Sequence, residues 1–255
     1  MLKMDAPYSL QLISMFSAYT HSIPVIYSVL EGQYAGDLFV DSKDNPQIAI
    51  LFTPFDFHFV AGNAQINKCV DVIDKAIFEH YLPETGKKEA IVFCPDPLWD
   101  KVLDEVFKRH NGIKDNRRVF RLNKEHFINH VYGSGKTLEG VENQLFYEQE
   151  RGAEKQYPTC RVFKDEECVS FCSGFMLGKG HAEINVFTLI EHRRKGYAKE
   201  ASVTLINELL NSGIEPDWCT WPYRTESEKL ALSLGYKLWK DIPAHIWVEA
   251  ECGVL

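Results

Sequence analysis

The sequence predicts an α/β fold with a mixed sheet, repeated in two domains along the chain. Two features of the C-terminal half support this prediction: an alternating strand over 182–188 and an amphipathic helix over 198–210. The strand has the two-residue period of a half-buried strand, and the helix repeats its apolar residues every three or four positions. Because a second helix and further strand-like segments follow, the C-terminal half predicts helices packed on a mixed sheet.

The loop between this strand and this helix has the composition of an anion site. It contains Arg193, Arg194 and Lys195, followed by Gly196 and Ala198. The first backbone N–H groups of a helix have no intrahelical partner, and the helix dipole adds partial positive charge there. Gly196 lets the backbone approach an anion closely, and Ala198 keeps the first turn thin. The loop therefore predicts a phosphate at the start of the helix.

The other elements of the C-terminal half follow from local patterns. A helical region is expected over 126–150 and a hairpin over 160–163 and 168–173. Gly213 and Pro216 end the 198–210 helix, and an apolar run follows over 218–221. Thr225-x-x-Glu228 predicts a capping box that opens a second helix, which ends at Gly235 before strand-like sequence over 236–250.

The N-terminal half predicts a smaller α/β domain of similar outline. A helix is expected over 9–19 and three strands over 37–40, 48–53 and 56–60, followed by a helix over 66–81, a strand over 90–94, a helix over 97–109 and a strand over 118–122. This half has no glycine-containing phosphate loop, so it has the outline of a degenerate copy of the C-terminal fold. The polar stretch 122–125 predicts a boundary that gives domains 1–124 and 125–255.

Composition narrows the class of function. The net charge of −8 argues against a general nucleic-acid binder and is compatible with cationic substrates. No apolar run has the ~20 residues of a membrane span, and Asp5 and Pro7 interrupt any signal peptide. The 7 cysteines include no Cys-x-x-Cys pair, which predicts reduced thiols in the cytoplasm.

Three metal or nucleotide motifs are incomplete. Gly133–Thr137 resembles the end of a P-loop, but His130 stands where the first glycine is required. His126 and His130 have the spacing of a zincin pair, but the residue after His126 is Phe127. Cys168 and Cys172 have no matching second pair. The sequence therefore predicts no metal site.

The Arg193-x-x-Gly196-x-Ala198 pattern, between its strand and its helix, resembles the acetyl-CoA pyrophosphate loop of the GCN5-related N-acetyltransferase (GNAT) family. Leu234-Gly235-Tyr236 matches the Leu-Gly-Phe/Tyr turn that follows a late helix in that family. The segments PDWCTW, TESEKLALSLGYKL and DLFVDSKDNPQIAILFTPFDFHFVAGNA are similar to its zwittermicin A resistance-type branch. The resemblance implies acetyl-CoA as cosubstrate and acetyl transfer to an amine of a small molecule, by direct attack in a ternary complex.

The resemblance also implies which residues bind the cosubstrate. The loop residues Arg193, Arg194, Lys195, Gly196, Tyr197 and Ala198 would hold the pyrophosphate. A backbone N–H within Val186, Phe187 and Thr188 would polarise the thioester carbonyl. Ser227 has two open roles, a contact to the pantetheine or adenosine end of CoA, or a part in capping its helix.

The catalytic groups are the less determined part of the site. Glu183 is the first candidate for the base that deprotonates the amine, and a solvated strand charge is its alternative role. Glu191 is the second candidate. Where the family often has a tyrosine that protonates the leaving thiolate, this chain has Ala231. Tyr223 or a water molecule would then supply the proton, or the thiolate leaves without one.

Two other functions remain open. One is a non-catalytic CoA-binding domain that senses acetyl-CoA or recruits a partner. The other is a tandem-fold aminoacyl transferase using charged tRNA, against which the CoA loop argues. The acceptor amine and the oligomeric state are not determined by the sequence.

Overall fold

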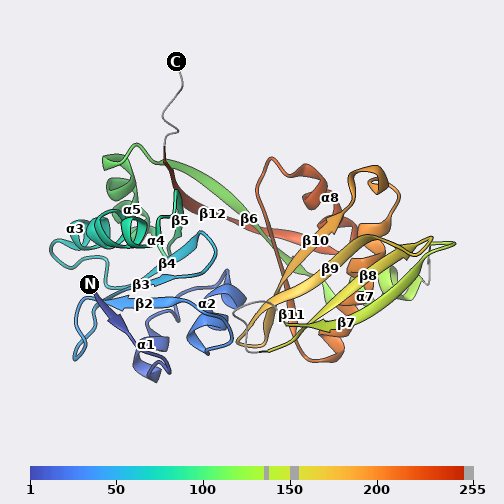
Figure 1. The fold of residues 1–255 in the computed structure, drawn as a ribbon, viewed down its shortest axis with the longest axis horizontal. Helices are drawn as coiled ribbons and strands as arrows, with labels where there is room; N and C mark the ends of the chain where they lie inside the picture. Colours follow the sequence, from blue (N-terminus) through green and yellow to red (C-terminus); the bar gives the residue numbers. More distant parts are fainter. Residues whose placement is uncertain (135–137, 150–154, 250–255) are drawn as a thin grey trace, which may run out of the picture. The chain divides into compact units, whose positions relative to one another are not determined.

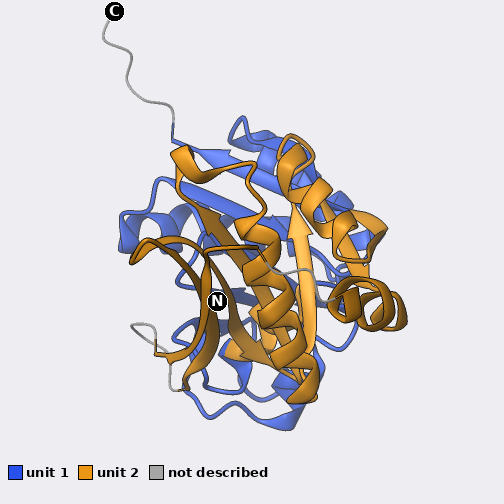
Figure 2. Cartoon of the chain, turned by 90° about the vertical axis from the view of Figure 1, so that its right-hand side faces the viewer, with its two compact units in different colours: residues 1–21, 29–116, 242–255 blue, residues 22–28, 117–241 orange. Residues whose placement is uncertain are grey.

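The computed structural model describes residues 1–134, 138–149 and 155–249, and it divides into two compact units (Figures 1 and 2). Unit 1 contains Met1–His21, Val29–Asn116 and the residues from Ile242 onward. Unit 2 contains Ser22–Ser28 and Arg117–Asp241. The units are therefore not separated by a single cut, and the boundary at 124/125 stays a prediction about independently folding domains.

Unit 1 contains six strands in the order β1-β2-β3-β4-β5-β12. All neighbours are antiparallel except β4 and β5, which are parallel. Its elements are β1 (Leu2–Met4), α1 (Leu10–Ser14), β2 (Asp37–Val40), β3 (Ile48–Phe52), β4 (Phe57–Gly62), α3 (Cys69–Asp74), the π-helix η1 (Lys75–Tyr81), α4 (Leu82–Thr85), β5 (Glu89–Phe93), α5 (Pro97–Arg109) and the end of β12 (Tyr236–Val248). Helix α2 (Ile23–Leu30) is divided between the two units.

Helix α5 shows how local sequence sets an element of unit 1. The Asp96 carboxylate accepts hydrogen bonds from the backbone N–H groups of Leu98 (2.8 Å) and Trp99 (3.1 Å), and Pro97 occupies the first turn. Both features favour a helix start. Trp99, Leu103 and Val106 then recur at helical spacing and are buried in the core of unit 1. The predicted helix over 97–109 is confirmed.

Unit 2 contains six strands in the order β6-β11-β10-β9-β8-β7. Only β10 and β11 are parallel neighbours. Its elements are the end of β6 (Ile113–Leu122, of which the residues up to Asn116 belong to unit 1), α6 (Lys124–His126), η2 (Phe127–Val131), η3 (Tyr132–Ser134), β7 (Glu142–Glu148), β8 (Tyr157–Lys164), β9 (Glu167–Gly178), β10 (His181–Thr188), η4 (Ile190–His192), α7 (Tyr197–Asn211), β11 (Glu215–Thr220), α8 (Thr225–Ser233) and the start of β12. Buried residues of α7, including Leu205 and Leu209, pack with Ala182, Ile184 and Trp218 of the strands.

Two local predictions are wrong, and one helix was not predicted. The helix expected over 126–150 ends at Ser134, and β7 follows and pairs with β8 from Glu142 to Glu148. The polar composition of this segment favours a helix, but the neighbouring strand supplies a full set of backbone partners. The helix expected over 9–19 shortens to α1, and α2 was not predicted. Residues 135–137 of the P-loop-like segment lie outside the described residues.

The capping box at Thr225 and Glu228 is also not formed. Arg224 precedes the first residue of α8, and no side chain caps that helix. The Glu228 carboxylate instead accepts from Arg118 of β6 at 2.5 Å. A charge-assisted bond to an arginine is stronger than a bond to a backbone N–H, which explains why the long-range partner is preferred.

The two units repeat one strand pattern. In each, four antiparallel strands lead to a parallel pair, and a sixth strand is antiparallel to the last of them. The sixth strand of unit 1 is β12, and that of unit 2 is β6. In the sequence, β12 follows the parallel pair of unit 2, and β6 follows the parallel pair of unit 1. Each unit therefore has as its sixth strand the one that comes directly after the other unit's parallel pair in the sequence. This repeat confirms that the N-terminal half has the outline of a second copy.

Within the described residues, no helix is both long and apolar enough to cross a membrane.

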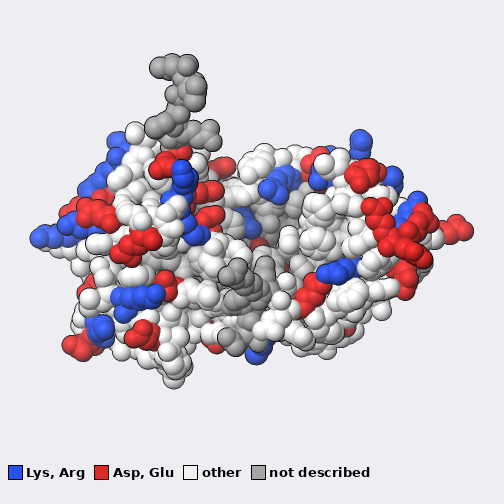
Figure 3. Space-filling model, viewed as in Figure 1, with Lys and Arg blue, Asp and Glu red and all other residues white. Residues whose placement is uncertain are grey.

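Figure 3 shows acidic side chains gathered at the end of unit 2 where β7, β8 and β9 lie. Glu142, Asp165 and Glu166 line a shallow hollow there.

His58 of β4 is expected to make unit 1 sensitive to acid. Its side chain is fully buried, and its Nδ1 accepts the backbone N–H of Thr53 at 3.4 Å. Burial lowers the pKa of His58 from 6.5 to about 3. Below pH 6.5 the unfolded chain therefore gains a proton that the folded chain does not, and stability falls as the pH falls. At 1.36 kcal/mol per pH unit, this loss is about 2.7 kcal/mol at pH 4.5.

Urea unfolding of the wild type and of His58→Asn, at pH 7.5 and pH 4.5, measures this loss. Asparagine keeps an acceptor for the Thr53 N–H but does not titrate. The variant should be less stable at pH 7.5 and should lose about 2.7 kcal/mol less than the wild type between the two pH values. Equal losses in both proteins would show that His58 is not responsible.

Candidate active site in unit 2

The parallel strands β10 and β11 separate in the middle of the unit 2 sheet. Their pairing runs from His181 and Glu215 to Glu183 and Asp217, and in the described residues it ends there. β11 then pairs on its other side with β6, while β10 continues beside β9 up to Thr188. One edge of β10 beyond Glu183 is therefore not occupied by a strand.

Val186 directs its backbone N–H toward this open edge. The Leu189 N–H donates to the Val169 carbonyl of β9 at 3.0 Å, so Leu189 faces β9. In an antiparallel ladder, the backbone N–H and C=O groups of successive residues point to opposite sides of the strand. Those of Phe187 therefore also point to β9, and those of Val186 and Thr188 point away from it. The Thr188 carbonyl on that side accepts Nε of Arg193 at 3.2 Å. The N–H groups of Val186 and Thr188 therefore both face the open edge, where they are suited to polarise a carbonyl.

The loop after β10 presents a helix start without a side-chain cap. Gly196 lies at the N-cap of α7 with φ 93° and ψ −8°, and the first intrahelical bond runs from Glu200 N–H to its carbonyl. The N–H groups of the first turn therefore have no partner within the helix. Arg194 also has a positive φ of 62°. The side chains of Arg193, Arg194 and Lys195 are exposed, Ala198 is half-buried, and Tyr197 is buried in the core.

Glu183 lies on the sheet face opposite α7, beside Arg117 of β6. Its Oε1 accepts from Nη2 of Arg117 at 3.3 Å, and its side chain is 6% exposed. Burial raises the pKa of the Glu183 carboxyl to about 7, opposed by the charge of Arg117 and aided by that of Asp217. A carboxyl with this pKa exists in both protonation states near neutral pH, as a general base requires.

The other predicted residues lie in less constrained places. Phe187 is 44% exposed and stacks on Phe171 of β9, with ring centroids 5.7 Å apart. The Ser227 Oγ accepts from Nε1 of Trp218 at 3.2 Å. Tyr223 is 67% exposed and stacks on Trp221. Ala231 is fully buried, and Glu191 is exposed on η4.

The sequence reasoning missed the charged neighbours of Glu183. Arg117 is 66 residues away in the chain and carries no local signal. Asp217 lies beside Glu183 in the ladder, and its carboxylate is 3.1 Å from Nδ1 of His181. The sequence contained one weak signal for Asp217. Asp217 and Cys219 alternate with the buried Trp218 and Thr220, so both lie on the sheet face opposite the core.

The equivalent position of unit 1 is filled by the protein itself. The pairing of β4 and β5 ends at Phe59 and Phe93. The Tyr19 hydroxyl lies 2.7 Å from the Val60 carbonyl and 2.9 Å from the Phe93 carbonyl. Tyr19 is thus buried where the two strands separate, so the site of unit 2 has no open counterpart there.

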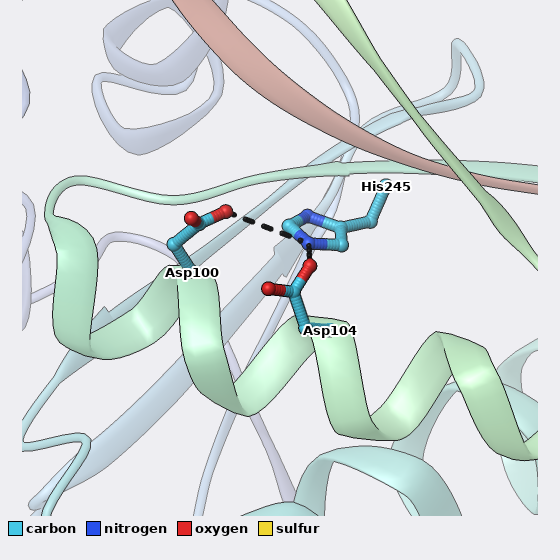
Figure 4. Close-up of side chains that lie close together, drawn as sticks. All are labelled: Asp100, Asp104 and His245. Carbon is cyan, nitrogen blue, oxygen red and sulfur yellow. Dashed lines mark hydrogen bonds and ion pairs between the residues drawn. The ribbon is translucent and has the colours of Figure 1, made fainter.

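Unit 1 contains a separate group of titratable side chains, Asp100, Asp104 and His245 (Figure 4). Nε2 of His245 lies 2.9 Å from Oδ1 of Asp104 and 3.6 Å from Oδ1 of Asp100. The ammonium of Lys114 lies 2.7 Å from Asp100 and 2.9 Å from Asp104, so both carboxylates already have a cationic partner. The group connects α5 to β12.

The family model of the GNAT acetyltransferases matches residues 15–157 and 144–244. The uncharacterized N-acetyltransferase YdfB of Bacillus subtilis is 24% identical over 228 residues, which cover 83% of this chain and 85% of YdfB.

Solved structures show the same fold. A GCN5-related N-acetyltransferase-like protein from Streptococcus suis superposes with a TM-score of 0.66 at 22% identity, covering 93% of this chain and 97% of its own. A tandem GNAT protein from the clavulanic acid biosynthesis pathway has a TM-score of 0.63 at 8% identity, covering 91% and 89%.

The fold and the site define an acyltransferase of the GNAT type, with two copies of the fold in one chain. The chain belongs to the GNAT acetyltransferase family.

Proposed function

We propose that unit 2 transfers the acetyl group of acetyl-CoA to an amine of a small molecule, by direct attack in a ternary complex. The observation that carries this proposal is the open edge of β10 at Val186, followed in the chain by the uncapped start of α7 at Gly196. The first supplies a donor for a thioester carbonyl, and the second supplies donors for a pyrophosphate.

Each group then has one task. The Arg193–Ala198 loop holds the pyrophosphate, with Arg193, Arg194 and Lys195 adding positive charge. The Val186 N–H, which precedes Phe187 and Thr188 in β10, donates to the thioester oxygen as it gains negative charge. The Ser227 hydroxyl donates a hydrogen bond to CoA, and its oxygen accepts one from Nε1 of Trp218.

The chemical step forms a C–N bond and breaks the C–S bond. Glu183 takes the proton that the ammonium must lose before the amine attacks. Tyr223 is proposed as the acid that protonates the departing thiolate, and the second proton that the nitrogen loses as the amide forms returns to the Tyr223 phenolate. Its exposed ring on Trp221 leaves the hydroxyl accessible to a ligand.

We also propose the zwittermicin A resistance-type branch for this chain, on the PDWCTW and TESEKLALSLGYKL segments. That placement makes an amine-bearing antibiotic one candidate among small acceptor amines. We propose the cytoplasm as the location, because six cysteines of the described chain are unpaired thiols.

Calorimetric titration with acetyl-CoA, followed by thiol release with a panel of primary amines, tests the proposal. Micromolar binding and amine-dependent release of CoA are expected. Binding without transfer to any amine would favour a CoA sensor, for which the buried Ala231 in place of the family's tyrosine is the favouring observation. Absence of binding would reject the acetyltransferase proposal and favour a transferase that uses charged tRNA.

A further inference from the structure

Arg117 of β6 contacts both the Glu183 carboxylate and the ring of Trp221, and all three residues belong to unit 2. Its Nη2 donates to Oε1 of Glu183 at 3.3 Å, and its guanidinium carbon lies 5.9 Å from the centroid of the Trp221 ring. The pair is almost fully buried, with 12% of the Arg117 side chain and 6% of the Glu183 side chain exposed. Because a guanidinium is planar and rigid, a carboxylate and an aromatic ring beside it restrict its orientation.

The two oxygens of the Glu183 carboxylate have different surroundings. Oε1 accepts from Arg117, whereas Oε2 is buried and has no hydrogen-bond partner among the described residues. A buried acceptor without a partner is unfavourable until a donor binds to it. The ammonium of an acceptor amine is such a donor, so the bond from Arg117 to Oε1 leaves one defined oxygen for the amine.

We propose that Arg117 is a positioning residue, which holds Glu183 with Oε2 available to the amine and keeps the carboxylate ionised at neutral pH. This inference rests on the proposed function, because it requires Glu183 to act as the base. Arg117 acts through Glu183 and need not contact acetyl-CoA or the acceptor.

The charge of Arg117 is needed because the other surroundings of Glu183 favour the protonated carboxyl. Burial raises the pKa of Glu183 to about 7, the charge of Arg117 opposes this rise, and that of Asp217 from β11 adds to it. The thiol of Cys219 from β11 and the phenol of Tyr236 from β12 also interact with Glu183, and neither carries positive charge. Since a nearby opposite charge lowers a carboxyl pKa by about 1–3 units, Glu183 without Arg117 would be mostly protonated at pH 7.

Arg118, the next residue of β6, provides a matched control. Its guanidinium pairs with Glu228 at 2.5 Å and with Asp241 at 3.8 Å. Successive side chains of a strand point to opposite faces of the sheet, so Arg118 points away from the face that carries Glu183. Replacing Arg118 therefore removes an ion pair from the same strand without removing the partner of Glu183.

The first test measures the protonation of Glu183 directly and needs no substrate. Carboxyl ¹³C NMR of the full-length protein is recorded between pH 5 and 10 for the wild type, Arg117→Met and Arg118→Met, and Glu183→Gln assigns the signal by its loss. Arg117→Met should raise the Glu183 midpoint by about 1–3 pH units, whereas Arg118→Met should leave it unchanged. Equal midpoints in the wild type and Arg117→Met would overturn the inference.

The pH profile of turnover then tests charge and orientation separately, with the first amine that the wild type acetylates. Arg117→Met should lose at least about fivefold at pH 7, and its rising limb should move to higher pH by the shift seen in the NMR titration. Arg117→Lys keeps the charge but not the fork of the guanidinium. It should keep the midpoint and lower the plateau by roughly 10- to 10²-fold. A wild-type plateau in Arg117→Lys, or a profile of Arg117→Met that matches the wild type, would overturn the positioning role.

Two further measurements separate this inference from folding and from the proposed function. Calorimetric titration should give the same affinity for acetyl-CoA in the wild type and both Arg117 variants, and a loss of binding would contradict a role that acts through Glu183. If Arg117→Met does not fold, the plateau of Arg117→Lys decides the positioning role. If the wild type acetylates no amine, the proposed function fails, and the NMR midpoints still decide whether Arg117 keeps Glu183 ionised.

Discussion

Glu183→Gln is expected to reduce acetyl transfer by about 10²- to 10⁴-fold, the usual contribution of a general base. Glutamine has nearly the shape of glutamate, and its amide oxygen still accepts from Arg117, so the sheet around it should remain intact. The affinity for acetyl-CoA should not change, because the Val186 N–H and the start of α7 are backbone groups that the substitution does not touch. Steady-state turnover together with calorimetric titration of acetyl-CoA measures both effects.

The pH dependence of the wild type gives the same residue a second readout. The pKa of Glu183 is raised to about 7, and only the ionised form accepts a proton. Turnover should therefore rise with pH through about 7, and Glu183→Gln should remove this rise. Glu191→Gln is the matched control, since Glu191 is exposed on η4. Full turnover in Glu183→Gln, or equal losses in both variants, would exclude Glu183 as the base.

Gly196→Trp is expected to weaken the binding of acetyl-CoA by at least about 10-fold while the protein remains folded. Gly196 has φ 93°, a conformation that side chains rarely adopt, and an added Cβ would lie 3.4 Å from the Leu138 side chain. An indole there would cover the N–H groups that bind the pyrophosphate. Losing one or two charge-assisted bonds of about 1.5–3 kcal/mol each weakens binding by roughly 10- to 10⁴-fold.

Gly213→Ala is the control for the strain of a left-handed residue. Gly213 lies just beyond the other end of α7, with φ 71° and open space around an added Cβ. Its substitution should reduce stability by about 1 kcal/mol and leave acetyl-CoA binding unchanged. Calorimetry of both variants, with thermal unfolding to confirm folding, completes the comparison. A dissociation constant of Gly196→Trp within threefold of the wild type would remove the α7 start from the site.

Local patterns predicted much of the fold and one half of the site. The strand at 182–188, the basic loop and the helix that follows it are set by side-chain period and by Gly196, all within a short stretch of chain. The same holds for α5, whose cap and first turn are adjacent in sequence. These features are predictable because the interactions that form them are local.

The charged half of the site was not predictable in this way. Glu183 was identified as a candidate, but its partner Arg117 comes from β6, and its neighbour Asp217 comes from β11. Pairing of strands distant in sequence depends on which edges meet, and no single segment encodes that. The strand β7 shows the same limit of local prediction. Its polar composition favours a helix, but in the structure it forms a strand because β8 provides backbone hydrogen-bond partners.

The sequence by itself determined the α/β class, the basic loop before α7 and Glu183 as the candidate base. Only the tertiary structure decided three other features: the sixth strands taken by each unit, the Tyr19 hydroxyl between β4 and β5, and the pairs Arg117–Glu183 and Asp217–His181. The physical reason is the range of the forces. Helix starts and strand alternation arise from neighbouring residues, whereas strand order and buried ion pairs arise from groups that meet only when the whole chain is packed.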